Sequence, residues 1–163
     1  MKDRWEALLA VLRKIISLYQ TILTLSQEKQ QILVSAKSQE LEKVTKQEEI
    51  LVLEISKLED LRRKLVGELM ATHSIEGEVS LSQLKKVATP SIAAQLETFG
   101  ENLRDIMKAI TPINKLNTEL INQALGFINY NINILSQTVV GPTYAPKGQA
   151  NEQTTRTVFD AKV

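Results

Sequence analysis

The residues that could take part in catalysis or bind a metal are few and lie apart in this sequence. His73 is the only histidine and there is no cysteine, so neither a catalytic triad nor a cluster of nitrogen and sulfur ligands can rest on several of them. The acidic pairs Glu48-Glu49 and Glu59-Asp60 are adjacent in sequence, and adjacent side chains on a helix point in different directions. No glycine-rich phosphate loop or nucleophile motif occurs. The sequence predicts a protein that is not an enzyme and that uses no metal or other cofactor.

The charge of the chain also excludes classes of partner. Its 20 basic residues are balanced by 19 acidic ones, which leaves no net field to attract nucleic acid or an anionic membrane. The amino terminus is charged where a signal peptide would need its apolar core. The most apolar stretch, residues 15–25, is too short to span a bilayer and carries Ser, Gln and Thr. We therefore expect a soluble cytoplasmic protein without stable membrane insertion and without a nucleic-acid partner.

The composition favours long helices, and these helices must position the polar residues of the chain. Hydrophobic residues make up 43% of the chain and aromatic residues only 4%, so the core must consist mainly of Leu, Ile and Val. Along residues 3–34, apolar side chains recur at three- and four-residue spacing, which predicts an amphipathic helix. A turn is expected at residues 35–38, with Ser38 as the N-cap of the next helix. The apolar positions of this first helix are Trp5, Leu8, Leu9, Leu12, Ile15, Ile16, Tyr19, Ile22 and Leu23.

A heptad pattern predicts a second helix over residues 38–71. Glu48 and Arg62 interrupt its apolar seam, which long side chains can tolerate. Two helices of about 50 Å each should form an antiparallel hairpin with coiled-coil-like packing. His73 follows the second helix, where we expect it to have a structural role because cations are favoured at helix carboxyl ends. The seam consists of Leu41, Val44, Leu51, Ile55, Leu58, Leu65 and Leu69.

Two further helices and a tail complete the predicted all-α fold. Ser80 and Gln83 form a capping box that opens a short helix over residues 81–87. Thr89-Pro90 is a start signal for a long third helix over residues 90–137. Pro112 predicts a kink in a nearly continuous helix. We expect residues 1–138 to form an elongated helical bundle and residues 139–163 a flexible tail.

The end of the third long helix is unusual because residues 120–140 carry no charge. At about 100° per residue, their apolar side chains cover an arc of roughly 220°, which is wider than one packed face requires. A first stripe comprises Ile113, Leu116, Leu120, Ala124, Phe127 and Ile134. A second stripe comprises Ile121, Leu125, Ile128, Ile132 and Leu135, and Tyr130 also lies in the arc.

Two interpretations of these stripes are open. Both stripes could be buried within the bundle, for instance against the charge-free residues 15–27 of the first helix. Alternatively, the first stripe packs on the hairpin and the second is left for another polypeptide as a groove for an amphipathic helix. The amides of Asn117, Asn122, Asn129, Asn131, Asn133 and Gln123 suit a surface that is apolar but soluble when empty.

The chain resembles a known family in three places. A charged heptad hairpin is followed by a long helix that ends in Asn-Gln-Ala-Leu-Gly-Phe-Ile-Asn-Tyr at residues 122–130. The tail contains Thr-Tyr-Ala-Pro-Lys-Gly-Gln at residues 143–149 and ends in Val-Phe-Asp-Ala-Lys-Val at residues 158–163. Together these features resemble FlgN, the flagellar chaperone of hook-associated proteins, over essentially the whole chain.

The resemblance implies a function. FlgN proteins are bacterial cytosolic chaperones that bind the carboxy-terminal helical regions of the hook-filament junction proteins FlgK and FlgL. They keep these cargoes unpolymerised and deliver them to the type III export gate. The family's cargo-binding region corresponds here to Leu120, Ile121, Leu125, Ile128, Ile132 and Leu135. The family's tail tyrosine, which contributes to contact with the gate component FlhA, corresponds to Tyr144, although Ala145-Pro146-Lys147 makes this loop more rigid.

Two alternatives remain open. A structural protein could self-associate through the seam between Leu41 and Leu69, as coiled coils do. A chaperone or adaptor of another secretion system would share the binding logic and carry a different cargo.

Overall fold

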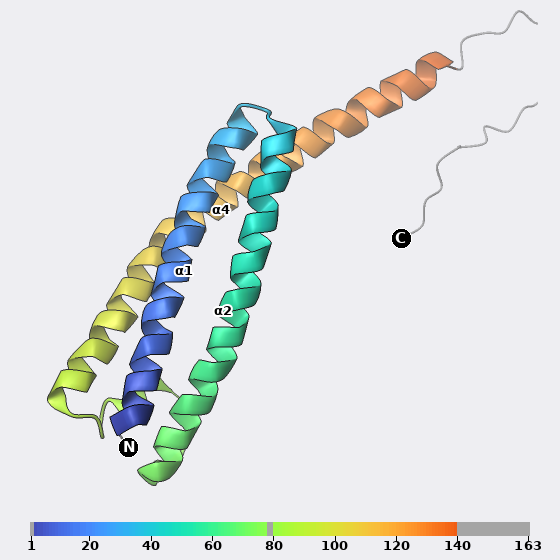
Figure 1. Cartoon of the computed structure of the whole chain (residues 1–163). Helices are drawn as coiled ribbons and strands as arrows, with labels where there is room; N and C mark the ends of the chain where they lie inside the picture. Colours follow the sequence, from blue (N-terminus) through green and yellow to red (C-terminus); the bar gives the residue numbers. More distant parts are fainter. Residues whose placement is uncertain (1, 78–79, 140–163) are drawn as a thin grey trace, which may run out of the picture. The chain divides into compact units, whose positions relative to one another are not determined.

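The protein is described by a computed structural model that covers residues 2–77 and 80–139, with the side chains of residues 3–77 and 80–137. Its described residues form α1 (Lys2–Val34), α2 (Ser38–Thr72), α3 (Leu81–Leu84) and α4 (Pro90–Val139), as Figure 1 shows, and contain no strand. The predicted all-α class is confirmed. The chain divides into two compact units, Met1–Leu125 and Gly126–Val163.

Helices α1 and α2 form an antiparallel hairpin in the first unit (Figure 1). Ion pairs join Arg4 to Glu68 at 3.5 Å and Lys14 to Glu54 at 3.2 Å, so residue numbers rise along one helix as they fall along the other. These pairs are largely exposed and contribute little to stability. The hairpin instead depends on the apolar side chains between its helices.

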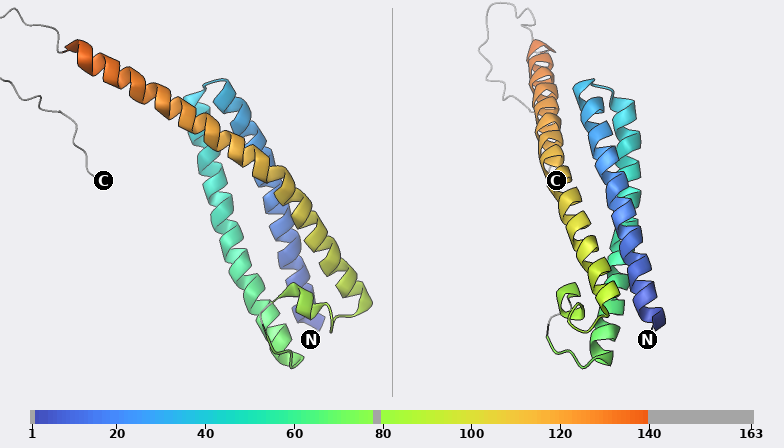
Figure 2. Two further views of the ribbon diagram at one scale, coloured as in Figure 1. Left: turned by 180° about the vertical axis from the view of Figure 1, so that it is seen from behind. Right: turned by 90° about the vertical axis from the view of Figure 1, so that its left-hand side faces the viewer.

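The apolar core of the first unit consists of two clusters along the hairpin. In both clusters α4 packs together with α1 and α2, and Figure 2 shows the first-unit part of α4, residues 90–125, running along the hairpin in two views. The base cluster contains Trp5, Leu8, Leu9, Val11, Leu12, Ile15, Val66, Leu69, Met70, Leu84, Leu96 and Phe99. The middle cluster contains Leu18, Ile22, Ile55, Ile106 and Ile110.

This packing occupies the seam that could have joined two copies of the chain. Val44, Ile55 and Leu69 are buried within the chain itself, and Leu58 and Leu65 are partly buried against the same core. A dimer through this seam would have to open the hairpin first. Self-association by that route is therefore not favoured by the fold.

The helix ends agree with the sequence signals in part. The prediction that Ser38 is an N-cap is wrong: Ser38 is the first residue of α2, and Lys37 precedes it without a side-chain cap bond. The turn is instead made by Ala36, whose positive φ of 54° reverses the chain. Ser80 and Thr89 are confirmed as N-caps, because Ser80 Oγ accepts from the Gln83 N–H at 3.4 Å and Thr89 Oγ1 from the Ile92 N–H at 3.5 Å.

Helix α3 is shorter than predicted, ending at Leu84 and not at Val87. The N–H of Lys86 donates to the Gln83 carbonyl and that of Val87 to the Leu84 carbonyl, each at 3.2 Å. These bonds span three residues, so the chain after Leu84 turns more tightly than an α-helix does.

Helix α4 continues through Pro112 without a break. Proline has no N–H, so the carbonyl four residues earlier loses its usual helical donor. One residue before it, Thr111 Oγ1 donates to the Met107 carbonyl at 2.7 Å. Pro112 itself is exposed, which leaves water free to reach the backbone that it leaves unbonded.

By length and composition alone, helix α1 is long and apolar enough over Asp3–Val34 to cross a membrane. This stretch is longer than residues 15–25, which the sequence analysis considered too short to span a bilayer. Its apolar side chains have a different use in the structure: Leu8, Leu12 and Ile15 are fully buried in the core of the first unit. The core of a helical bundle accounts for this composition.

His73 lies at the end of α2, where its backbone N–H donates to the Leu69 and Met70 carbonyls at 3.1 Å. Its ring packs against that of Trp5, with the ring centres 6.2 Å apart. These contacts belong to the core at the base of the hairpin and give His73 a structural environment.

Candidate functional site

The second stripe of α4 becomes exposed along the helix. Leu120 and Ile121 are half-buried, whereas Leu125 is 52%, Ile128 51% and Ile132 55% exposed. Leu135, the last predicted residue of this face, is also exposed. The described part of the second unit, Gly126–Val139, is helical throughout, and Ile128, Ile132 and Leu135 lie on its surface. The interpretation in which both stripes are buried is therefore wrong.

The first stripe does not pack on the hairpin as the other interpretation required. Ile113 and Leu120 are half-buried, but Leu116, Ala124 and Phe127 are exposed. The face of α4 that packs on α1 and α2 runs through Leu96, Phe99, Ile106, Ile110 and Asn117, at helical spacing. Continued along the helix at about 100° per residue, that face coincides with the second stripe, whereas the first stripe lies roughly 90° away from it.

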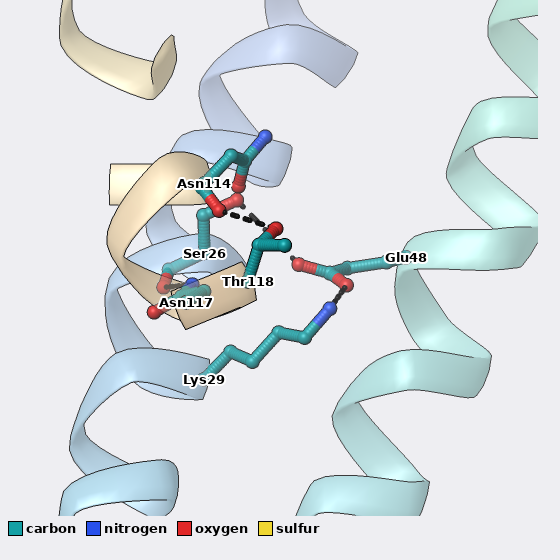
Figure 3. A network of polar contacts seen from close by, with 6 residues as sticks. All are labelled: Ser26, Lys29, Glu48, Asn114, Asn117 and Thr118. Atoms are coloured by element: carbon teal, nitrogen blue, oxygen red, sulfur yellow. Dashed lines mark hydrogen bonds and ion pairs between the residues drawn. The ribbon is translucent and has the colours of Figure 1, made fainter. Parts of the chain in front are cut away.

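A polar layer replaces apolar packing where α1, α2 and α4 meet near the turn of the hairpin (Figure 3). The Asn117 side-chain amide of α4 donates to the Ser26 carbonyl of α1 at 2.9 Å. Lys29 Nζ of α1 lies 2.7 Å from Glu48 Oε2 of α2, and Ser26 Oγ donates to Glu48 Oε1 at 3.5 Å. Thr118 Oγ1 donates to the carbonyl of Asn114 on α4 itself, at 2.9 Å. The layer comprises Ser26, Lys29, Glu48, Asn114, Asn117 and Thr118.

The structure corrects the expectation for one of these residues and explains another. Asn117 was expected on a soluble surface but is 3% exposed. Glu48 interrupts the apolar seam as predicted, and its carboxylate is paired there with Lys29. The missed signal is that Asn117 follows Ile110 by seven residues, on the same face of α4. A buried amide needs a defined partner, so the layer fixes the position of α4 along the hairpin within the first unit.

The polar layer is not arranged for catalysis. Lys29 and Glu48 neutralise each other, and both side chains are mostly buried. Ser26 has no neighbouring histidine to act as a base, because His73 packs beside Trp5 at the base of the hairpin. Among the residues with described side chains, no three of the His, Cys, Asp or Glu type come together in a way that could hold a metal ion.

A hollow of about 380 Å³ lies between α1 and α4 in the first unit. Its walls are mainly apolar, with Arg13 as its one charged lining residue. Nearby, burial and secondarily the Glu59 carboxylate raise the pKa of Tyr19 above its ordinary value of 10.0, which keeps the phenol neutral. This region also lacks the pairs of acid and base that hydrolysis or group transfer would need. The hollow is lined by Leu9, Leu12, Arg13, Ile16, Ala94, Gln95, Thr98, Phe99 and Asn102.

The geometry thus favours binding through an uncharged apolar helix face. Comparison with known proteins gives the family: the FlgN protein family matches residues 1–152 of the chain. The chain belongs to the FlgN family. This is a family of cytosolic flagellar export chaperones and not of enzymes. Tyr144, the residue that the FlgN resemblance connects with the export gate, lies outside the described residues.

One relative supports the family assignment over most of the chain. The protein is 27% identical over 130 residues to an uncharacterized protein of Bacillus subtilis, YvyG. The match covers 80% of this chain and 79% of that relative. No solved structure matches the chain significantly.

Proposed function

We propose that this FlgN-family protein binds the carboxy-terminal helical region of the hook-filament junction proteins FlgK, FlgL or both. The observation that supports this proposal most directly is the exposed second stripe, in which Leu125, Ile128 and Ile132 are each about half exposed. Large apolar side chains in a row on a surface are costly in water and typically mark a protein interface. An amphipathic helix of the cargo would cover them with its own apolar face.

The same surface explains how a cargo would be kept unpolymerised. A terminal helix of the cargo would be apolar on one side, and while α4 covered that side it could not pack against another cargo subunit. A cargo segment that folds on binding loses conformational entropy, which offsets part of the gain from apolar burial. The affinity would then be moderate, as release at the export gate requires.

Delivery to the gate belongs to the same proposal. Tyr144 would contact FlhA, by its similarity to the family's tail tyrosine. It lies 19 residues beyond Leu125 in the sequence, so the cargo and the gate would be bound by different parts of the chain. A cargo on α4 would therefore not have to leave before the gate is engaged.

Titration calorimetry of the full chain against the carboxy-terminal segment of FlgK from the same organism tests the cargo proposal. We expect saturable binding near one to one with a negative heat-capacity change, the sign of apolar burial. Leu125→Asp and Ile132→Asp should abolish binding and leave the circular dichroism of the chain unchanged, because both positions are exposed. Asn133→Asp, an exposed change outside both stripes, is the control.

Two results would contradict the proposal. If neither FlgK nor FlgL gives heat or a complex at tens of micromolar, a range in which even weak specific partners associate, the cargo assignment fails. If Leu125→Asp unfolds the first unit, the stripe belongs to the core and is not a binding surface.

A further inference from the structure

The described end of α4 exposes large apolar side chains on more than one side. Beside the second stripe, Phe127 is 68% and Tyr130 63% exposed. On a helical wheel with Leu125 at zero and about 100° per residue, Ile128 and Ile132 lie within about 60° of it. Phe127 and Tyr130 lie about 160° and about 140° from it, so they point away from the second stripe. One flat groove could not cover both sides.

The remaining sector of this helix is polar but uncharged. Asn122, Asn129 and Asn133 lie within about 60° of each other on the wheel, and all three are exposed. They separate the two apolar sides along one edge of the helix, where water would remain in contact with it. The other edge carries Ala124 and, about 20° from it, the half-buried Asn131, so a small side chain and a neutral polar one lie between the two apolar sides there.

The first unit shows what an apolar face on α4 can accommodate. There α4 packs on two helices at once, since Ile106 and Ile110 share a cluster with Leu18 and Ile22 of α1 and with Ile55 of α2. The exposed arc at the end of α4, roughly 220° wide, exceeds the stripe of about 100° that packing against one neighbour requires. It is wide enough for two neighbouring helices, one on each side.

We propose that the cargo binds this part of α4 with two helical segments of a single chain, one on the Leu125–Ile128–Ile132 side and one on the Phe127–Tyr130 side. This inference rests on the proposed function and specifies the shape of its cargo. The first segment, once bound, holds the second at a high effective concentration, so a single cargo chain covers both sides more readily than two separate ones. The two sides then bind cooperatively.

The chemistry of α4 also defines the cargo faces. Residues 120–140 contain no charged side chain, so a charged residue in the middle of either cargo face would be buried without a counterion. Each cargo segment must therefore be amphipathic, with aliphatic or aromatic residues toward α4 and its charges toward water. The affinity should change little with salt concentration, because no ion pair crosses the interface.

Three consecutive positions provide a matched test. Phe127, Ile128 and Asn129 are all exposed and successive side chains point about 100° apart, so the same carboxylate can be placed on either apolar side or in the polar sector. We would titrate the full-length F127D, I128D and N129D variants with the carboxy-terminal segment of FlgK, and with that of FlgL, and check helicity by circular dichroism. We expect F127D and I128D each to weaken binding at least about 10-fold and N129D to change it by less than about 3-fold, at one cargo per chain.

The outcomes separate this inference from the function on which it rests. If I128D weakens binding and F127D does not, the cargo contacts one side only, which overturns the two-sided proposal and leaves the proposed function intact. A stoichiometry of two cargo chains overturns it as well, and so does an equal loss in all three variants, which would show a general effect of charge. If the unmodified protein binds neither FlgK nor FlgL, both proposals fail.

Discussion

The polar layer shows how single residues determine the packing of the first unit. Ser26 and Asn117 are almost completely buried, and the Asn117 Oδ1 atom has no hydrogen-bond partner within the described part of the chain. Such a layer is less favourable than apolar packing but accepts only one alignment of the helices. In the first unit it would oppose sliding of α4 along the hairpin.

At the residue scale, removing one partner of the Lys29–Glu48 pair should cost more than removing both. Lys29→Met leaves the Glu48 carboxylate, whose side chain is 16% exposed, without its cation. We expect the free energy of unfolding to fall by about 1–3 kcal/mol, because a partly buried charge is then unpaired. The double variant Lys29→Met with Glu48→Leu should return to within about 1 kcal/mol of the unmodified protein. Urea unfolding measures both values, and a double variant as unstable as the single one would contradict this account.

At the scale of elements, α4 combines strong helix formers with residues that weaken a helix. Pro112 removes one backbone donor from the part of α4 in the first unit, and Gly126 stands in the helix at the start of the second. A Cβ atom added at Gly126 would meet nothing within 4 Å. The glycine is therefore not required by packing, and it lowers the stability of the helix around it.

Replacing this glycine should strengthen the end of α4. Gly126→Ala is expected to stabilise the local helix by about 0.5–1 kcal/mol, since alanine loses less backbone entropy on folding. Hydrogen exchange at the amides of residues 127–132 should slow by about 3-fold, which corresponds to that free energy. Gly77→Ala is the matched control: φ at Gly77 is +120°, so the same substitution there should lower stability. An unchanged exchange rate in Gly126→Ala would mean that this segment does not open as a local helix.

At the scale of the whole molecule, apolar residues serve two separate purposes. Leu12 is 1% exposed in the base cluster, whereas Leu125 is half exposed on α4. Both are leucines in amphipathic helices with the same type of spacing, so they cannot be distinguished by residue type. What separates them is whether another helix of the same chain covers them.

Alanine substitutions at these two leucines should therefore affect different properties, the stability of the fold at Leu12 and cargo binding at Leu125. Leu12→Ala should lower the free energy of unfolding by about 2–5 kcal/mol, because it leaves a cavity in the core. Leu125→Ala should lower it by less than about 1 kcal/mol and weaken binding of the FlgK segment instead. Denaturant unfolding and calorimetry on both variants give the comparison. A loss of stability in Leu125→Ala as large as in Leu12→Ala would place Leu125 in the core.

The sequence by itself determined the helical class, the hairpin and most helix limits, because these depend on periodicity and on local signals such as the Thr89-Pro90 start. It also identified residues 120–140 as unusual, since the absence of charge there is visible without a structure. Only the tertiary structure decided that Asn117 is buried against Ser26, that Glu48 pairs with Lys29 in the polar layer, and that both stripes at the end of α4 are exposed. The physical reason is that periodicity specifies which residues share a helix face but not which neighbour covers that face. Which neighbour covers a helix face depends on contacts between residues far apart in the chain, such as Ser26 with Asn117.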